Sequence, residues 1–118
     1  MPSMEAEKIV YKITPQSDWR EAEKSGVFKG APIDLADGFI HFSTADQVAE
    51  TAAKHFSGQS DLLLVAIDAG ALGPALKYEV SRGGALFPHL YADLDMSSVL
   101  WAKPMPLGAD GVHEISFG

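Results

Sequence analysis

The run from Asp61 to Asp68, DLLLVAID, constrains the fold of this chain more than any other segment. Its central residues are all apolar, it has the length of a strand, and turn-forming residues bound it. A strand with one face in solvent alternates apolar and polar residues, whereas a strand covered on both faces is apolar throughout. We therefore expect residues 61–68 to form a central strand.

Two segments in the N-terminal half have the pattern of helices. The first begins at Thr14-Pro15, where an N-cap residue precedes a proline, and ends at Gly26, which favours a left-handed C-cap. The second lies between the capping pair Ser43-Thr44 and Gly58, and its apolar residues recur at helical spacing: Val48, Ala52 and Phe56. Residues 27–37, which contain the breaker GAP, are expected to form a loop.

Short β-rich runs fill the rest of the chain, at residues 8–13, 38–42, 75–80, 87–91, 98–102 and 112–117. Helices and strands do not alternate as they do in doubly wound proteins. We expect the α+β class: a single domain over residues 7–118, with two N-terminal-half helices packed on a mixed, largely antiparallel sheet. Residues 1–6 are expected to form a flexible N-terminal tail.

Composition excludes several classes of function. Nine basic and sixteen acidic residues give a net charge of −7, which disfavours extended nucleic-acid binding, although one cation can still hold a small anion or nucleotide. The chain contains no cysteine, so thiol and disulfide chemistry are absent. No apolar stretch is long enough to span a membrane, and the N-terminus lacks a signal-peptide pattern, so we expect a cytoplasmic protein without membrane contact. No heptad repeat indicates an oligomeric state.

Two histidines are the main candidates for a ligand site. His41 lies in GFIHFST, where an apolar strand meets a helix cap, and His89 follows a proline in FPHLY. A buried imidazole needs hydrogen-bond partners, so each is either a satisfied core residue or a group that faces a ligand. The spacing of these histidines and the carboxylates matches no metal motif, so no metal site is expected.

Four further residues are candidates for a ligand site. Ser43 and Thr44 cap the second helix and place its free N–H groups next to His41, where an anionic group could bind. Glu79 ends a strand before the SRGG loop, as a site carboxylate or a solvated one. Tyr91 is either a core residue or a ring-stacking residue.

The segments YKITPQSDWREAEKSGVFKG, DGFIHFSTADQVAETAAKHF, LLLVAIDAGALGPALKYE and FPHLYADLDMSSVLW, in this order, resemble the bacterial family called domain of unknown function 952. The resemblance extends from Lys8 to about Pro106, and GFIHFST and FPHLY are its most specific parts. The fold of that family is similar to the ADP-ribosyltransferase group, which implies NAD as the candidate cofactor. By order along the chain, the group's polar, aromatic and acidic site positions fall on Lys12, His41 and Glu79.

This resemblance implies that Glu79 and His41 are catalytic, with Glu79 stabilising the sugar cation formed when the nicotinamide–ribose bond breaks. The remaining candidates would bind the ligand: Lys12, Ser43, Thr44, His89 and Tyr91. Family members usually read Tyr-His where this chain reads Tyr11-Lys12, and a protonated lysine cannot accept a hydrogen bond. A ligand-binding domain without turnover is therefore one alternative, and a structural or interaction domain is another.

Overall fold

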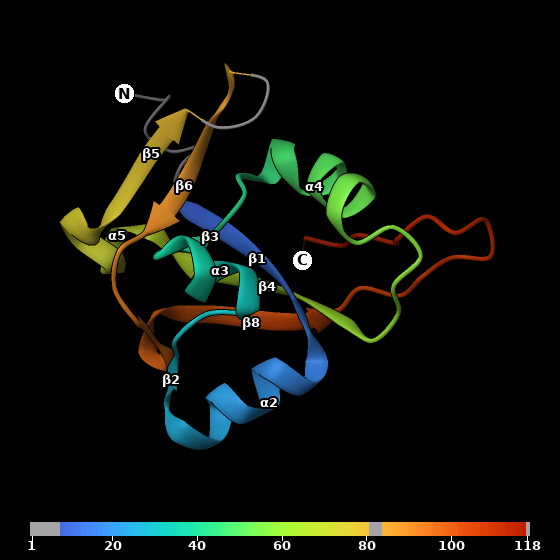
Figure 1. The fold of residues 1–118 in the computed structure, drawn as a ribbon. Helices are drawn as coiled ribbons and strands as arrows, with labels where there is room; N and C mark the ends of the chain where they lie inside the picture. Colours follow the sequence, from blue (N-terminus) through green and yellow to red (C-terminus); the bar gives the residue numbers. More distant parts are fainter. Residues whose placement is uncertain (1–7, 81–83, 118) are drawn as a thin grey trace.

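The computed structural model describes residues 8–80 and 84–117 (Figure 1). The expected N-terminal tail, residues 1–6, lies outside the described residues. The strands are β1 (Ile9–Pro15), β2 (Val27–Phe28), β3 (Ile40–His41), β4 (Leu62–Asp68), β5 (Leu76–Val80), β6 (Leu86–Leu90), β7 (Leu94–Asp95) and β8 (Val99–Pro104). The helices are α2 (Gln16–Ser25), α3 (Pro32–Asp37), α4 (Val48–His55) and α5 (Ala69–Leu72), with 3-10 turns η1 (Ala45–Gln47), η2 (Gly73–Ala75) and η4 (Met96–Ser98).

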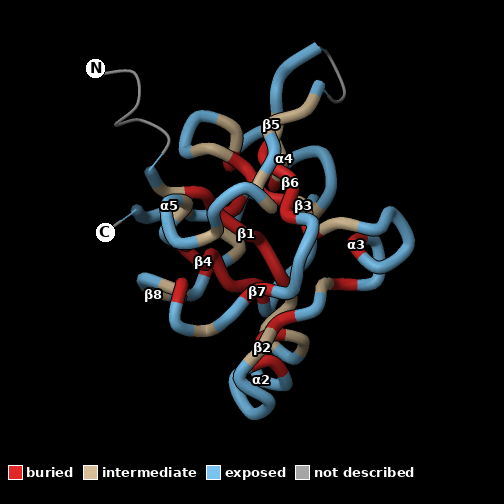
Figure 2. Tube along the Cα trace, turned by 90° about the vertical axis from the view of Figure 1, so that its left-hand side faces the viewer, coloured by how far each residue is buried: buried red, intermediate tan, exposed pale blue. Residues whose placement is uncertain are grey.

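Strand β4 is the centre of the main sheet, which confirms the prediction from DLLLVAID. It pairs with β1 on one side and with β8 on the other, and every residue from Leu62 to Ile67 is buried (Figure 2). Alternate side chains of β4 enter two separate cores. Trp19 of α2 packs into one core and Val48 of α4 into the other, so the two predicted helices cover opposite faces of this sheet.

A second sheet, in the order β3-β6-β5, lies beside the first, and β2 pairs with β7. Every strand pair among the described residues is antiparallel, so the α+β class is confirmed but the expectation of a mixed sheet is wrong. Tyr11 and Ser43 exchange two backbone hydrogen bonds of 2.8 Å, which tie the segment after β3 to β1. This junction places the end of β3 against the middle of β1.

Two segments differ from the sequence prediction. Residues 27–37 are not a loop, because they contain β2 and the short helix α3, which opens with a proline at its N-terminus. Residues 112–117 are not a strand: within them only His113 forms a bridge, to Leu107 across a tight turn. Among the described residues, no helix is long and apolar enough to cross a bilayer.

Gly30 is required at the entrance to α3. Its φ is +125°, and a Cβ built there would lie 2.8 Å from the Cβ of Asp34. We expect Gly30→Ala to lower the free energy of unfolding by about 2–3 kcal/mol, measured by urea denaturation, because it adds a clash to an unfavourable backbone conformation. Gly26→Ala is the control, since φ is +88° but no atom lies within 4 Å of the added Cβ. Equal losses in the two variants would show that the contact with Asp34 is unimportant.

Candidate functional site

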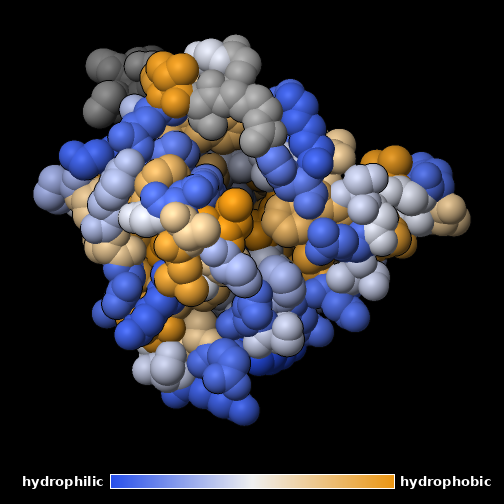
Figure 3. Space-filling view, viewed as in Figure 1, coloured by the Kyte–Doolittle hydropathy of each residue, from blue (hydrophilic) through white to orange (hydrophobic). Residues whose placement is uncertain are grey.

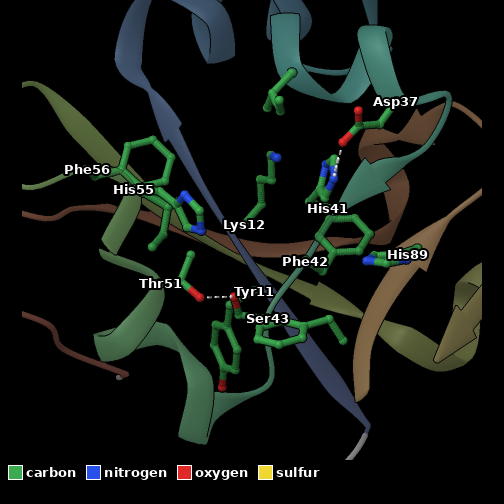
Figure 4. Close-up of a pocket in the computed structure, with 13 residues that line it drawn as sticks. Tyr11, Lys12, Asp37, His41, Phe42, Ser43, Thr51, His55, Phe56 and His89 are labelled. Atoms are coloured by element: carbon green, nitrogen blue, oxygen red, sulfur yellow. Dashed lines mark hydrogen bonds and ion pairs between the residues drawn. The ribbon is translucent and has the colours of Figure 1, made fainter. Parts of the chain in front are cut away.

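A cavity of about 420 Å³ opens where β1, the end of β3, β6 and α4 meet (Figure 4). Lys12 reaches into it from β1, His41 and His89 line it from β3 and β6, and Thr51 and His55 line it from α4. Four aromatic residues also line the cavity, together with Ile13, Ile33, Asp37 and Ser43: Tyr11, Phe42, Phe56 and Phe87. In the space-filling view this face of the molecule is hollowed, and apolar surface lies at the rim (Figure 3).

Asp34 is the buried centre of the polar network behind this cavity. Its side chain is only 1% exposed, and its two oxygens accept from Lys12 Nζ at 3.1 and 2.9 Å. His41 Nδ1 donates to Asp34 Oδ1 at 2.6 Å, and the backbone N–H groups of Ala31 and His41 donate at 2.8 and 3.1 Å. Burial alone would raise the pKa of Asp34, but the hydrogen bond from His41 and the charge of Lys12 outweigh it and lower that pKa to about 2.

Lys12 is held between this carboxylate and the cavity. Its side chain is 5% exposed, and burial lowers the pKa of Lys12, because the lost hydration outweighs the attraction of Asp34. An ammonium group carries three N–H donors, so the contacts with the two oxygens of Asp34 leave donor capacity for a ligand. The buried pair fixes this cation at the cavity surface.

His41 has a carboxylate on each ring nitrogen. Nδ1 contacts Asp34, and Nε2 lies 2.9 Å from Asp37 Oδ2 at the end of α3. Two ionised carboxylates can both be satisfied only when both nitrogens carry hydrogen, which is the imidazolium form. His41 is one-third exposed, so its ring also faces the cavity.

His89 is oriented by a carboxylate outside the cavity. Its Nδ1 lies 2.7 Å from Glu79 Oε1, and Tyr91 donates its hydroxyl to the same oxygen at 2.7 Å. The hydrogen bond from His89 is the main reason that the pKa of Glu79 is lowered. Phe39 stacks on the His89 ring at 4.2 Å between centroids, and the rings of His41 and His89 lie 5.4 Å apart. Within the described residues, Nε2 of His89 makes no hydrogen bond.

The structure brings four of the predicted site residues to the cavity: Lys12, His41, Ser43 and His89. The other three do not line it. Thr44 lies at the start of η1, where its backbone N–H donates to Gln47 Oε1 at 3.0 Å. Glu79 and Tyr91 lie behind His89, and their contacts with it position the imidazole. Ser43 is engaged as well, with Oγ 3.0 Å from Oγ1 of Thr51.

Sequence reasoning missed the two aspartates of α3, Asp34 and Asp37. Both fall in the segment that was assigned to a loop, and Asp34 contacts residues 22 and 7 positions away along the chain. The available signal was Pro32, because a proline at the first position of a helix followed by an aspartate in the first turn is typical of a helix start.

The donors of the cavity suit a ligand with both an anionic group and a planar ring. Lys12 and His41 supply N–H donors for a phosphate or carboxylate, and the aromatic side chains offer faces on which a ring can stack. In the described part of the chain, no group of three His, Asp or Glu residues is arranged to hold a metal ion. The polar residues of the cavity offer hydrogen bonding, charge and proton transfer by histidine.

Residues 13–102 match a family described as "Protein of unknown function (DUF952)". The chain belongs to the DUF952 family. The crystal structure of Protein CC0527 from Caulobacter crescentus is similar to this DUF952 protein, with 50% sequence identity and a TM-score of 0.86. The similarity covers 90% of this chain and 93% of that chain.

The solution NMR structure of the same Caulobacter crescentus protein has a TM-score of 0.80 to this chain at 50% identity, over 89% of this chain and 90% of that one. No match is found among curated proteins. The family match spans Asp34, His41 and His89 and begins one residue after Lys12.

Proposed function

We propose that this DUF952 protein binds a small nucleotide-type ligand in the cavity between β1, β3, β6 and α4. The observation that carries the proposal is the gathering of the Lys12 ammonium group and the His41 imidazole with aromatic rings around one hollow. The volume of about 420 Å³ falls within the range of small-molecule sites, which are mostly apolar with a few convergent polar groups.

NAD and its fragments are the first candidates for this ligand. A phosphate or ribose oxygen would accept from Lys12 and His41, while a base or nicotinamide ring would stack on the partly exposed aromatic side chains Phe56 and Phe87. NAD is tested first because the sequence leads us to expect that the family resembles the ADP-ribosyltransferase group. The net charge of −7 does not oppose this, since Lys12 and the N–H donors of His41 act at short range.

A transferase-like enzyme is the second candidate, and His89 is the observation that favours it. A carboxylate on Nδ1 keeps that nitrogen protonated, so in the neutral ring Nε2 carries the lone pair of a general base. Glu79 would act through His89, because it does not line the cavity. Incubation with NAD would then release nicotinamide, a water or acceptor hydroxyl group would take its place on the ribose and give its proton to His89 Nε2, and His89→Gln would reduce the rate by about a hundredfold or more. If NAD binds but no nicotinamide is released, the result supports a non-catalytic ligand-binding domain.

Filling the cavity tests the binding proposal. We expect wild-type protein to bind ADP-ribose or NAD in calorimetry, and Thr51→Trp to weaken binding at least about tenfold, because the indole would occupy the space of the ligand. Glu50→Trp is the matched control: it adds the same ring one residue away on α4, at an exposed position that does not line the cavity.

Circular dichroism establishes that both tryptophan variants are folded before affinities are compared. The proposal fails if NAD, ADP-ribose and AMP all leave the wild-type melting temperature unchanged, because a bound ligand at a hundred times Kd stabilises by about 2.7 kcal/mol. It also fails if a folded Thr51→Trp protein binds as tightly as wild type.

A further inference from the structure

Asp37 and Asp34 hold the same imidazole in different ways. Asp34 is 1% exposed and is fixed by Lys12, Ala31 and His41 together. Asp37 is 44% exposed, and within the described residues the contact of its carboxylate with His41 Nε2 is the sole polar contact recorded for it. A change of side-chain rotamer is therefore enough to separate Asp37 from His41, whereas Asp34 cannot leave without breaking the network.

The stability of α3 does not explain an aspartate at this position. Asp37 is the last residue of the helix, directly before the C-cap Gly38, and a negative charge near a helix C-terminus is disfavoured by the helix dipole. No basic residue lies in the last turn of α3 to offset it. Instead of a basic residue in the last turn, the structure provides His41 as the partner of the Asp37 carboxylate.

Charge balance shows what this contact does to the cavity. In the form in which both ring nitrogens of His41 donate to their carboxylates, Lys12 and His41 contribute two positive charges, Asp34 and Asp37 contribute two negative charges, and the group is neutral while Asp37 is in place. When the Asp37 carboxylate turns away, the remaining three residues carry one net positive charge beside an unpaired Nε2–H. Such a site matches a single anionic oxygen group.

We propose that Lys12 and His41 form a subsite for one monoanionic oxygen group, a phosphate or a carboxylate, and that Asp37 occupies this subsite as an internal competitor in the absence of ligand. This inference rests on the proposed function, because the subsite is part of the same cavity. The incoming oxygen replaces the Asp37 carboxylate at His41 Nε2 and accepts a further N–H from Lys12. Asp34 stays in place and keeps both Lys12 and His41 oriented.

Removing the competitor should strengthen binding of anions alone. We expect Asp37→Ala to bind ADP-ribose and inorganic phosphate about tenfold more tightly in calorimetry. The anion then no longer has to displace the Asp37 carboxylate from His41 Nε2 before it binds. Nicotinamide has no anionic group, so its affinity should not change. Asp93→Ala is the control: it removes one exposed carboxylate outside the cavity and so makes the same change in net charge. Acetate, titrated in parallel, distinguishes a carboxylate subsite from a phosphate one.

The outcomes separate this inference from the proposed function. If wild type binds ADP-ribose and Asp37→Ala binds ADP-ribose, phosphate and acetate no more tightly, the competitor role is overturned and the proposed function stands. If no nucleotide binds but phosphate or acetate binds more tightly to Asp37→Ala, the subsite is supported and the nucleotide proposal fails. An equal gain in Asp93→Ala would overturn the inference, since net charge alone would then explain the effect.

Discussion

Replacing Asp34 with asparagine is expected to lower the free energy of unfolding by about 3–5 kcal/mol, because it leaves the buried ammonium of Lys12 without its counter-charge. Asparagine has nearly the same shape as aspartate, so the loss of stability reports the removed charge and not the creation of a cavity. Urea denaturation followed by tryptophan fluorescence at neutral pH measures it, since Trp19 is 1% exposed in the core.

A second substitution separates this charge effect from general damage to α3. Lys12→Met in the Asp34→Asn background removes the stranded cation, so the double variant should recover part of the lost stability. Asp93→Asn, at an exposed position, should change stability by less than about 0.5 kcal/mol. A loss below about 1 kcal/mol in Asp34→Asn, or a double variant no more stable than the single one, would contradict a buried ion pair at this position.

Acid should remove the stabilisation that the same carboxylate provides. The pKa of Asp34 is about 2 in the folded protein, below the 3.8 of an unperturbed aspartate, so the folded state binds this proton more weakly than the unfolded chain does. The contribution of Asp34 is therefore fully present above about pH 5 and is lost as the pH falls toward 2. Its size is about 2 kcal/mol.

The pH dependence is measured as the difference between wild type and Asp34→Asn, because other carboxyl groups titrate in the same range. The pKa values of Glu79 and Asp95 are also lowered, by the hydrogen bond from His89 and by the backbone N–H of Ser97 respectively. Those effects are present in both proteins and cancel. We expect the gap between the two stability curves to narrow by about 2 kcal/mol as the pH falls from 5 toward 2, and curves that remain parallel from pH 7 to 2 would refute the shifted pKa.

The elements that the sequence predicts well are those whose pattern is local. Strand β4 is recognisable because every residue from Leu62 to Ile67 is apolar, and α4 because its apolar residues repeat at helical spacing. Helix α3 has six residues and buries only Asp34, so it shows no apolar periodicity. Residues 112–117 contain apolar residues of strand type but lie in a turn-bounded segment with a single bridge, at His113. Whether such a segment forms a strand depends on the strands available to pair with it, and not on its β propensity.

Some residues of the candidate site could likewise be singled out from the sequence, and others could not. His41 and His89 could be singled out because a histidine in an apolar strand needs a partner, and the structure pairs both with carboxylates. Lys12 appeared as a departure from the family pattern, and its role depends on Asp34, which is 22 residues away in the chain. The burial of an aspartate in a segment rich in turn residues arises from tertiary pairing alone. Sequence periodicity therefore could not locate the centre of this network.

The most direct test of the account is an NMR titration of the histidine ring signals with ADP-ribose. The rings of His41 and His89 line the cavity, whereas His113 is bound to the backbone oxygen of Gln59 away from it and serves as an internal reference. The account predicts that the His41 and His89 signals shift in a saturable manner while the His113 signal stays constant. A titration in which only His113 shifts, or in which ADP-ribose, NAD and AMP move none of these signals, would contradict the assignment of this cavity as a ligand site.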